Sequence, residues 1–213
     1  MSNKESLRGA SEISMKPKPL MTRPLSKQDV GLQLDLNKQA GTLRPLHGLN
    51  SYVPLQEIAM NYPVPILEKV NALRVPYCYF HDTALENVGL DLIDVSRIFP
   101  IFSADPEDPS NYRFSANDEF LQRVVDAGAK IIYRLGESIE KTKTKFRTTP
   151  PADFEKWANI CVHIIKHYNE GWADGFHWNI RHWTIWEEPN GFNGLWNSTF
   201  EEYLRLYETT SKI

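Results

Sequence analysis

The fold is decided by one stretch of sequence, IRHWTIWEEPN, at residues 180–190. Polar and apolar side chains alternate from Ile180 to Ile185, which predicts a β-strand. Two glutamates follow the strand, and Pro189 prevents it from continuing because proline has no backbone N–H to donate. Glu187 and Glu188 are therefore expected at the carboxyl end of a strand, the rim at which barrel enzymes place their catalytic groups.

The same alternation of strands and helices runs upstream of this stretch. Further strands are predicted at Leu46–Leu49, Pro76–Phe80 and Lys130–Leu135. The helices between and after the strands are predicted around residues 66–73, at 117–126, from Pro150-Pro151 onward, and from a capping box at Ser198-Thr199-Phe200-Glu201. Four successive β/α units predict an α/β fold with a parallel sheet, namely the first half of a (β/α)₈ TIM barrel.

The helix faces that should meet the sheet follow from the 3.6-residue period. In the first helix the apolar face is Ile66, Leu67, Val70 and Leu73. In the third helix it is Phe154, Trp157, Ala158, Cys161, Val162, Ile165 and Tyr168. In the fourth helix it is Phe200, Tyr203, Leu204 and Tyr207.

The chain has 213 residues, whereas a complete barrel typically needs about 250. Residues 1–40 are polar, rich in Lys, Ser, Pro and Gln, and are expected to form a leader or loosely packed arm, leaving 41–213 as the half-barrel. The amino-terminal region has no apolar signal core, and no stretch reaches the length of a membrane span. A cytoplasmic location without membrane contact is therefore expected.

Composition argues against several functions. A net charge of −3 gives no reason to expect nucleic acid as a partner. The sequence contains neither a GxGxxG nor a GxxxxGK[ST] motif, so no nucleotide cofactor is predicted. His163 and His167 lack the glutamate of a zinc protease motif and are expected to be solvated or capping residues, with no metal bound. Cys78 and Cys161 are expected to be reduced core residues.

Glu188 is the candidate proton donor. Adjacent strand residues point to opposite faces, so Glu187 and Glu188 should not form a catalytic pair with each other. Glycoside cleavage needs one carboxylic acid to protonate the leaving oxygen and a second carboxylate as nucleophile or base. Apolar surface from Trp183 and Trp186 would favour the protonated acid by raising its pKa.

Two further features fit a sugar site, and each has a structural alternative. Five of the six tryptophans fall within residues 172–196 and could stack on sugar rings, although aromatic residues are also ordinary core components. The long connection at residues 82–115 would emerge on the catalytic face and could wall the site, or it could be an ornament without function.

Several segments, in order along the chain, resemble glycoside hydrolase family 39, the β-xylosidase and α-L-iduronidase family of retaining (β/α)₈ glycosidases. They are Asn111–Phe114, Tyr133–Gly136, Thr149–Trp157, His167–Trp172 and Trp186–Asn190. The resemblance implies that Glu188 is the acid/base and that Asn190 supports the site. It also implies sugar contacts for His81, for Trp186 and Glu187, and for His47 and Asn50 at the end of the first strand.

The sequence departs from the family in two ways. Glu187 replaces an asparagine that donates a hydrogen bond to a sugar hydroxyl, whereas a carboxylate can only accept one, and its charge should raise the pKa of Glu188. The family's nucleophile follows the seventh strand, and Glu137 or Glu140 would be improvised substitutes. The expected function is a retaining glycosidase acting on xylosides or related glycosides, with this chain supplying the acid/base half.

Other interpretations remain open at this point. The chain could be an inactive half-barrel that binds a carbohydrate or a partner. It could also fold poorly, because an open parallel sheet exposes an unpaired edge, or it could associate through that edge as a homo-oligomer or with a missing C-terminal half.

Overall fold

A computed structural model describes residues 35–38, 41–42, 44, 47–50, 72–80, 92–138, 143–190 and 194–212. Contacts divide the chain into two units, residues 1–42 and 43–213. In the first unit, the described residues include a turn in which the Asp35 carboxylate accepts a hydrogen bond from the backbone N–H of Asn37 at 3.0 Å. The β/α elements all lie in the second unit.

Four parallel strands form one sheet in the order of the sequence, as predicted. They are β1 (Leu49–Asn50), β2 (Tyr77–Phe80), β3 (Lys130–Leu135) and β4 (His182–Ile185). The register places Asn50 beside Tyr79, Phe80 beside Tyr133, and Leu135 beside Ile185. The third strand has the predicted bounds, while the other three are shorter than or shifted from the predicted ranges.

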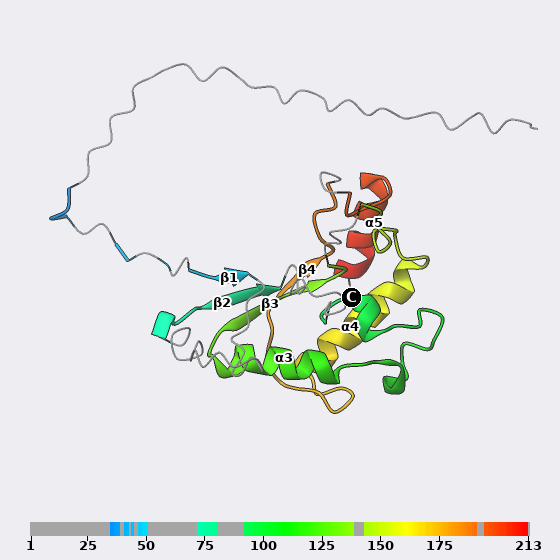
Figure 1. Ribbon diagram of the computed structural model, residues 1–213, viewed down its shortest axis with the longest axis horizontal. Helices are drawn as coiled ribbons and strands as arrows, with labels where there is room; N and C mark the ends of the chain where they lie inside the picture. Colours follow the sequence, from blue (N-terminus) through cyan, green and yellow to red (C-terminus); the bar gives the residue numbers. More distant parts are fainter. Residues whose placement is uncertain are drawn as a thin grey trace, which may run out of the picture. The chain divides into compact units, whose positions relative to one another are not determined.

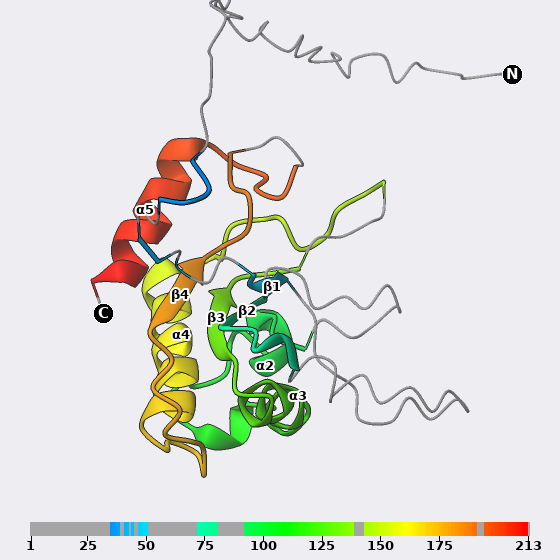
Figure 2. The ribbon, with the colours of Figure 1, turned by 90° about the vertical axis from the view of Figure 1, so that its left-hand side faces the viewer.

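The described helices are α2 (Val95–Ile98), η1 (Pro109–Asn111), α3 (Ser115–Asp126), α4 (Phe154–Asn169) and α5 (Phe200–Ser211). The longest, α4, begins after Asp153, whose carboxylate accepts from the N–H of Lys156 at 3.0 Å and so satisfies one orphan donor of the first turn. Helices α3 and α4 lie on one side of the sheet (Figure 1), and α5 packs against α4 (Figure 2).

Alternation along the strands separates two faces of the sheet. Side chains such as those of Phe80, Tyr133 and Leu135 are buried on the face covered by helices. The opposite face, which would line the inside of a closed barrel, carries the half-buried Tyr79, Ile132 and Thr184. The α/β half-barrel prediction is thereby confirmed for the strands that the structure describes.

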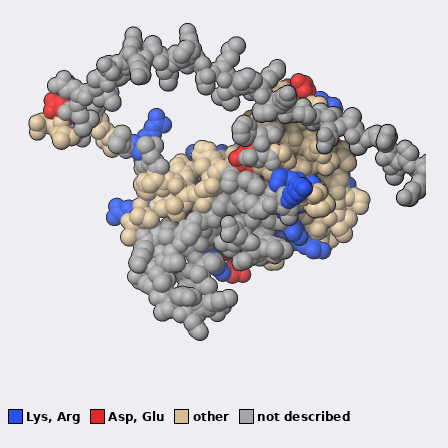
Figure 3. Space-filling model, turned by 45° about the horizontal axis from the view of Figure 1, so that its top comes forward, with Lys and Arg blue, Asp and Glu red and all other residues tan. Residues whose placement is uncertain are grey.

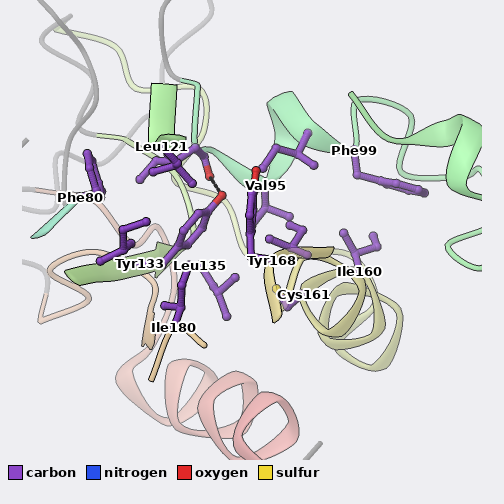
Figure 4. Packing of buried hydrophobic residues seen from close by; sticks show 14 of the residues in the cluster. Phe80, Val95, Phe99, Leu121, Tyr133, Leu135, Ile160, Cys161, Tyr168 and Ile180 are labelled. Carbon is purple, nitrogen blue, oxygen red and sulfur yellow. Dashed lines mark hydrogen bonds between the residues drawn. The ribbon is translucent and has the colours of Figure 1, made fainter. Parts of the chain in front are cut away.

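The core between β3 and α4 contains a buried polar network as well as apolar side chains. Figure 4 shows Tyr133 and Tyr168 close together in this layer, and their ring centroids are 5.8 Å apart. The Asn117 amide donates to both hydroxyls, at 3.1 and 2.6 Å, and the Tyr168 hydroxyl donates to Asp118 at 2.9 Å. Cys161 lies in the same cluster, and both it and Cys78 are buried thiols outside any disulfide, as predicted.

His163 and His167 were predicted to be solvated or capping residues, and the solvated alternative was wrong, because both are buried on α4. The ring of His167 stacks on Phe114 with centroids 3.6 Å apart, and its Nε2 lies 3.0 Å from Asp118. His163 Nε2 lies 3.3 Å from Glu107. An imidazole can be buried when both of its nitrogens have hydrogen-bond partners. The buried face of α4 is therefore wider than the apolar pattern of the sequence indicated.

The predicted last helix also needs correction. Thr199 rather than Ser198 is its N-cap, and the hydroxyl of Thr199 accepts from the N–H of Glu202 at 3.1 Å. Of its residues only Leu206 is buried, whereas the predicted core-facing Phe200, Leu204 and Tyr207 are 52%, 43% and 46% exposed. The periodicity found the apolar stripe, but the described part of the chain does not cover it.

Two other predicted segments differ from expectation. The predicted helix at 66–73 falls mostly outside the described residues, and Leu73, which was expected on its apolar face, is exposed. The connection at 82–115 contains α2 and η1 in its described part. Its first described residues bury Ile93, Ile98 and Phe99 in the core, whereas residues 100–111 are exposed or half-buried.

Among the described residues, no helix is both long enough and apolar enough to cross a membrane. Figure 3 shows Lys and Arg side chains at several separate places on the described surface of the face drawn. The absence of a nucleic-acid partner stays a prediction.

Candidate active site

The segment after β4 makes a tight, left-handed turn. The backbone N–H of Trp186 donates to the carbonyl of Leu135 at 2.7 Å, which extends the pairing with β3 by one bond. Trp186 and Glu188 then have φ values of 66° and 38°, a region that residues other than glycine occupy at a cost of about 1–3 kcal/mol. Within the turn Trp186 and Glu187 are both buried, whereas Glu188 is half-buried.

Gly136 at the end of β3 makes room for this turn. A Cβ atom built on Gly136 would lie 2.8 Å from the Cα of Trp186 and 3.3 Å from its nitrogen. Both contacts are with backbone atoms, which cannot move aside as a flexible side chain could. The end of β3 and the glutamate pair are therefore in direct backbone contact.

Gly136→Ala is expected to destabilise the protein by about 1–3 kcal/mol, the usual range for overpacking, and to displace residues 186–188. Urea unfolding would measure the first effect. Gly48→Ala is the matched control, because its Cβ would meet nothing closer than the carbonyl oxygen of Tyr77 at 3.4 Å. Equal unfolding midpoints for the two variants would contradict the proposed packing constraint.

Glu187 points toward β2. The Tyr79 hydroxyl lies 3.4 Å from Oε2 of Glu187 and donates to it. Burial raises the pKa of Tyr79, and the negative charge of Glu187 raises it further. The buried carboxylate therefore lies on the face of the sheet that would line a closed barrel, and a tyrosine of β2, two strands away from β4 in the sheet, orients it.

Trp186 has the contacts of a core residue. It is 5% exposed, and its indole N–H donates to the carbonyl of Leu195 at 2.8 Å. Its ring lies against those of Trp157 and Trp196, with centroids 6.1 and 5.0 Å away. Trp183 packs on Tyr133 in the same helix-covered layer. A sugar contact for Trp186 stays a prediction, and the observed packing supports the core alternative for this ring.

Of the other predicted site residues that the structure describes, Asn50 lies close to a residue that contacts Glu187. Asn50 lies beside Tyr79 in the sheet register, so it is next to the residue that contacts Glu187. Asn190 is exposed at the end of the turn. His47, just before β1, is exposed, and its Nε2 lies 3.0 Å from the carbonyl oxygen of Leu73, just before β2. His81 and Glu140 lie outside the described residues.

A buried charged cluster, which the sequence did not indicate, lies beside this turn. Asp94 is fully buried and accepts hydrogen bonds from Arg134 at 2.5 Å, from Ser138 at 2.7 Å and from Arg147 at 2.7 Å. Nε and Nη1 of Arg134 have no hydrogen-bond partner within the described part of the chain. The cluster joins the segments that follow β2 and β3.

Glu137 completes the cluster. Its carboxylate accepts from the backbone N–H of Ser96 at 3.1 Å and from the hydroxyl of the same serine at 2.6 Å, and it lies 3.9 Å from Arg147. Burial, followed by the negative charge of Asp94, raises the pKa of Glu137 to about 7. Glu137 is thus a strand-end carboxylic acid that can change protonation near neutral pH.

This shift predicts a pH-dependent stability. The pKa of Glu137 is about 7 in the folded protein against an ordinary value of 4.5, so the folded state binds the proton more tightly. Protonated Glu137 therefore contributes to the free energy of unfolding. This contribution is complete below pH 4.5 and is lost as the pH rises through 7, by up to about 3 kcal/mol. Urea unfolding at a series of pH values would measure the loss.

Glu137→Gln should remove this dependence. Glu155→Gln, at an exposed position of α4, is the control and should leave it unchanged. A slope between pH 4.5 and 7 that persists in Glu137→Gln would mean that another group is responsible.

Within the described ranges no group of three His, Cys, Asp or Glu side chains could hold a metal ion.

Comparisons with known proteins agree on one family. The family model described as "Glycosyl hydrolases family 39" matches residues 72–213. A β-xylosidase from Geobacillus stearothermophilus is 34% identical over 70 residues, which are 32% of this chain and 13% of that protein. A β-xylosidase from Caldicellulosiruptor saccharolyticus is 27% identical over 108 residues, or 46% of this chain and 22% of that protein.

A solved structure shares the fold. The glucosidase from Croceicoccus marinus superposes with a TM-score of 0.66 at 23% identity, covering 82% of this chain and 35% of the other. The matched regions therefore span about one fifth or less of the two β-xylosidases and about one third of the glucosidase.

Proposed function

The chain belongs to glycosyl hydrolase family 39, and from that premise we propose that it supplies the acid/base half of a retaining glycosidase site, with Glu188 as the proton donor. The observation that carries the proposal is the left-handed turn at the carboxyl end of β4, which keeps Glu188 half-buried and Glu187 buried. A backbone strained in this way, at the catalytic rim of a parallel sheet, is typical of functional sites.

In this proposal the Glu188 carboxylic acid protonates the glycosidic oxygen as the bond to the anomeric carbon breaks. A second carboxylate attacks the anomeric carbon and forms a glycosyl-enzyme, and Glu188 then removes a proton from the water that hydrolyses it. In the test described below, a joined C-terminal half supplies the second carboxylate. The chain's own contribution is therefore proton transfer and the orientation of the sugar.

Glu187 has a distinct role in this scheme. Its carboxylate accepts a hydrogen bond from Tyr79 and can accept another from a sugar hydroxyl, in place of the donation that asparagine would give. Asn50, the register partner of Tyr79, is a further candidate for sugar contact. Because two relatives are named β-xylosidases, a xyloside or related glycoside is the proposed substrate.

The test joins this chain to a C-terminal half that carries a strand-end glutamate. Hydrolysis of an aryl xyloside with retention of configuration, followed by proton NMR, would support the proposal. The alternative is an inactive half-barrel that binds sugar, and the replacement of the family's asparagine by Glu187 is the observation in its favour. Saturable quenching of tryptophan fluorescence by xylose without any turnover would favour this alternative.

A further inference from the structure

A pocket of about 220 Å³ lies behind the glutamate turn, on the helix-covered side of the sheet. Its walls come from α2 and the residues after it, from the segment leading into α4, from the first turns of α4 and from Trp186. Glu187, by contrast, points to Tyr79 on the other face. The pocket is therefore separate from the place where the sugar is proposed to bind.

Most of the pocket wall is aromatic or aliphatic. The pocket is lined by four aromatic side chains, Phe99, Phe102, Trp157 and Trp186. All of them except Phe102 are buried. A dry apolar cavity of about 150 Å³ is large enough for benzene. A pocket of about 220 Å³ can therefore hold one aromatic ring with a small substituent.

One end of the pocket is polar, and its charges balance. Glu137, Arg147 and Ser96 line this end. Asp94 and Arg134 stand directly behind them, since Asp94 is bonded to both arginines. Two carboxylates and two guanidinium groups leave no net charge above about pH 7, where Glu137 is ionised. A neutral group that both donates and accepts hydrogen bonds suits this end better than an ion, because an ion would leave an uncompensated charge in a largely apolar site.

We propose that this pocket is a second binding site, for a neutral molecule made of one aromatic ring and a hydroxyl group. The ring contacts Trp157 and Trp186, and the hydroxyl meets Glu137 and Arg147. Trp186 directly precedes Glu187, and the backbone of Trp186 packs on Gly136. A molecule in the pocket therefore contacts Trp186, the first residue of the glutamate turn, without touching the sugar. The site does not depend on the proposed glycosidase activity.

Benzyl alcohol is the probe, and the fluorescence of the full chain is the readout, because two pocket walls are tryptophans. A saturable change is expected. Toluene, which has the same ring and no hydroxyl, should bind about fivefold to tenfold more weakly, since it lacks one net hydrogen bond. Equal affinity for the two probes would overturn the proposed polar recognition.

Ala152→Phe places a ring at the exposed edge of the pocket and should abolish the saturable change. Ala116→Phe, at an exposed position of α3, is the matched control and should bind as the original chain does. Circular dichroism of both variants establishes that they are folded. No saturable change in the original chain, or the same binding by both variants, would overturn the proposal. Neither readout uses turnover, so a failure here is distinct from a failure of the glycosidase proposal.

Discussion

Glu188→Gln is expected to lower kcat/KM for a xyloside with a poor leaving group by about 10²–10⁴-fold, the usual contribution of general acid catalysis. The amide has the shape of the acid but no proton to give. The measurement uses the chain joined to a C-terminal half with a strand-end nucleophile. A nitrophenyl xyloside, whose leaving group needs little protonation, should lose much less activity in the bond-breaking step.

Glu187→Gln is the control for this experiment. It neutralises the adjacent carboxylate but leaves Glu188 in place, so the dependence on the leaving group should stay close to that of the original protein. Turnover of the poor-leaving-group substrate by Glu188→Gln at the original rate would remove Glu188 from the mechanism. Another group would then have to donate the proton to the leaving oxygen.

Asp94→Ala should destabilise the fold by about 3–5 kcal/mol, because it leaves the fully buried Arg134 without its counter-charge. The cost should be at the upper end, since two nitrogens of Arg134 already lack a partner in the described part of the chain. Urea unfolding followed by circular dichroism would measure it. Glu119→Ala, which breaks the exposed pair between Arg123 and Glu119, should cost less than about 1 kcal/mol.

A second substitution tests the cause. Asp94→Ala with Arg134→Met removes both charges and should recover part of the lost stability, because no unpaired charge remains buried. If the double variant is as unstable as the sum of the two single variants, the loss comes from packing and not from the charge. Asp94→Ala at the stability of the original chain would contradict the importance of the cluster.

The sheet could be predicted from the sequence because its signals are local. Lys130–Leu135 is a short apolar run next to Gly128, and its predicted bounds coincide with β3. The position of the glutamates at a strand end also followed from local chemistry, since Pro189 cannot continue a strand. The family could be identified from short segments that keep their order along the chain.

What could not be predicted depends on contacts between distant residues. Nothing near Asp94 in the sequence indicates that it meets Arg134 and Arg147, which are 40 and 53 residues away. Burial of His167 requires Asp118, 49 residues earlier. The stripe on α5 was recognised correctly as apolar, but periodicity does not say what covers a helix face. The left-handed backbone at Trp186 and Glu188 has no signal at all in these residue types.

That backbone has an evolutionary consequence. Glycine or asparagine would adopt the φ value at position 188 with less strain than glutamate does. Selection for folding alone would therefore favour the loss of the glutamate, while selection for proton transfer would retain it. In homologues that no longer need the reaction, position 188 should be among the first in this region to drift, well before the apolar core of the half-barrel.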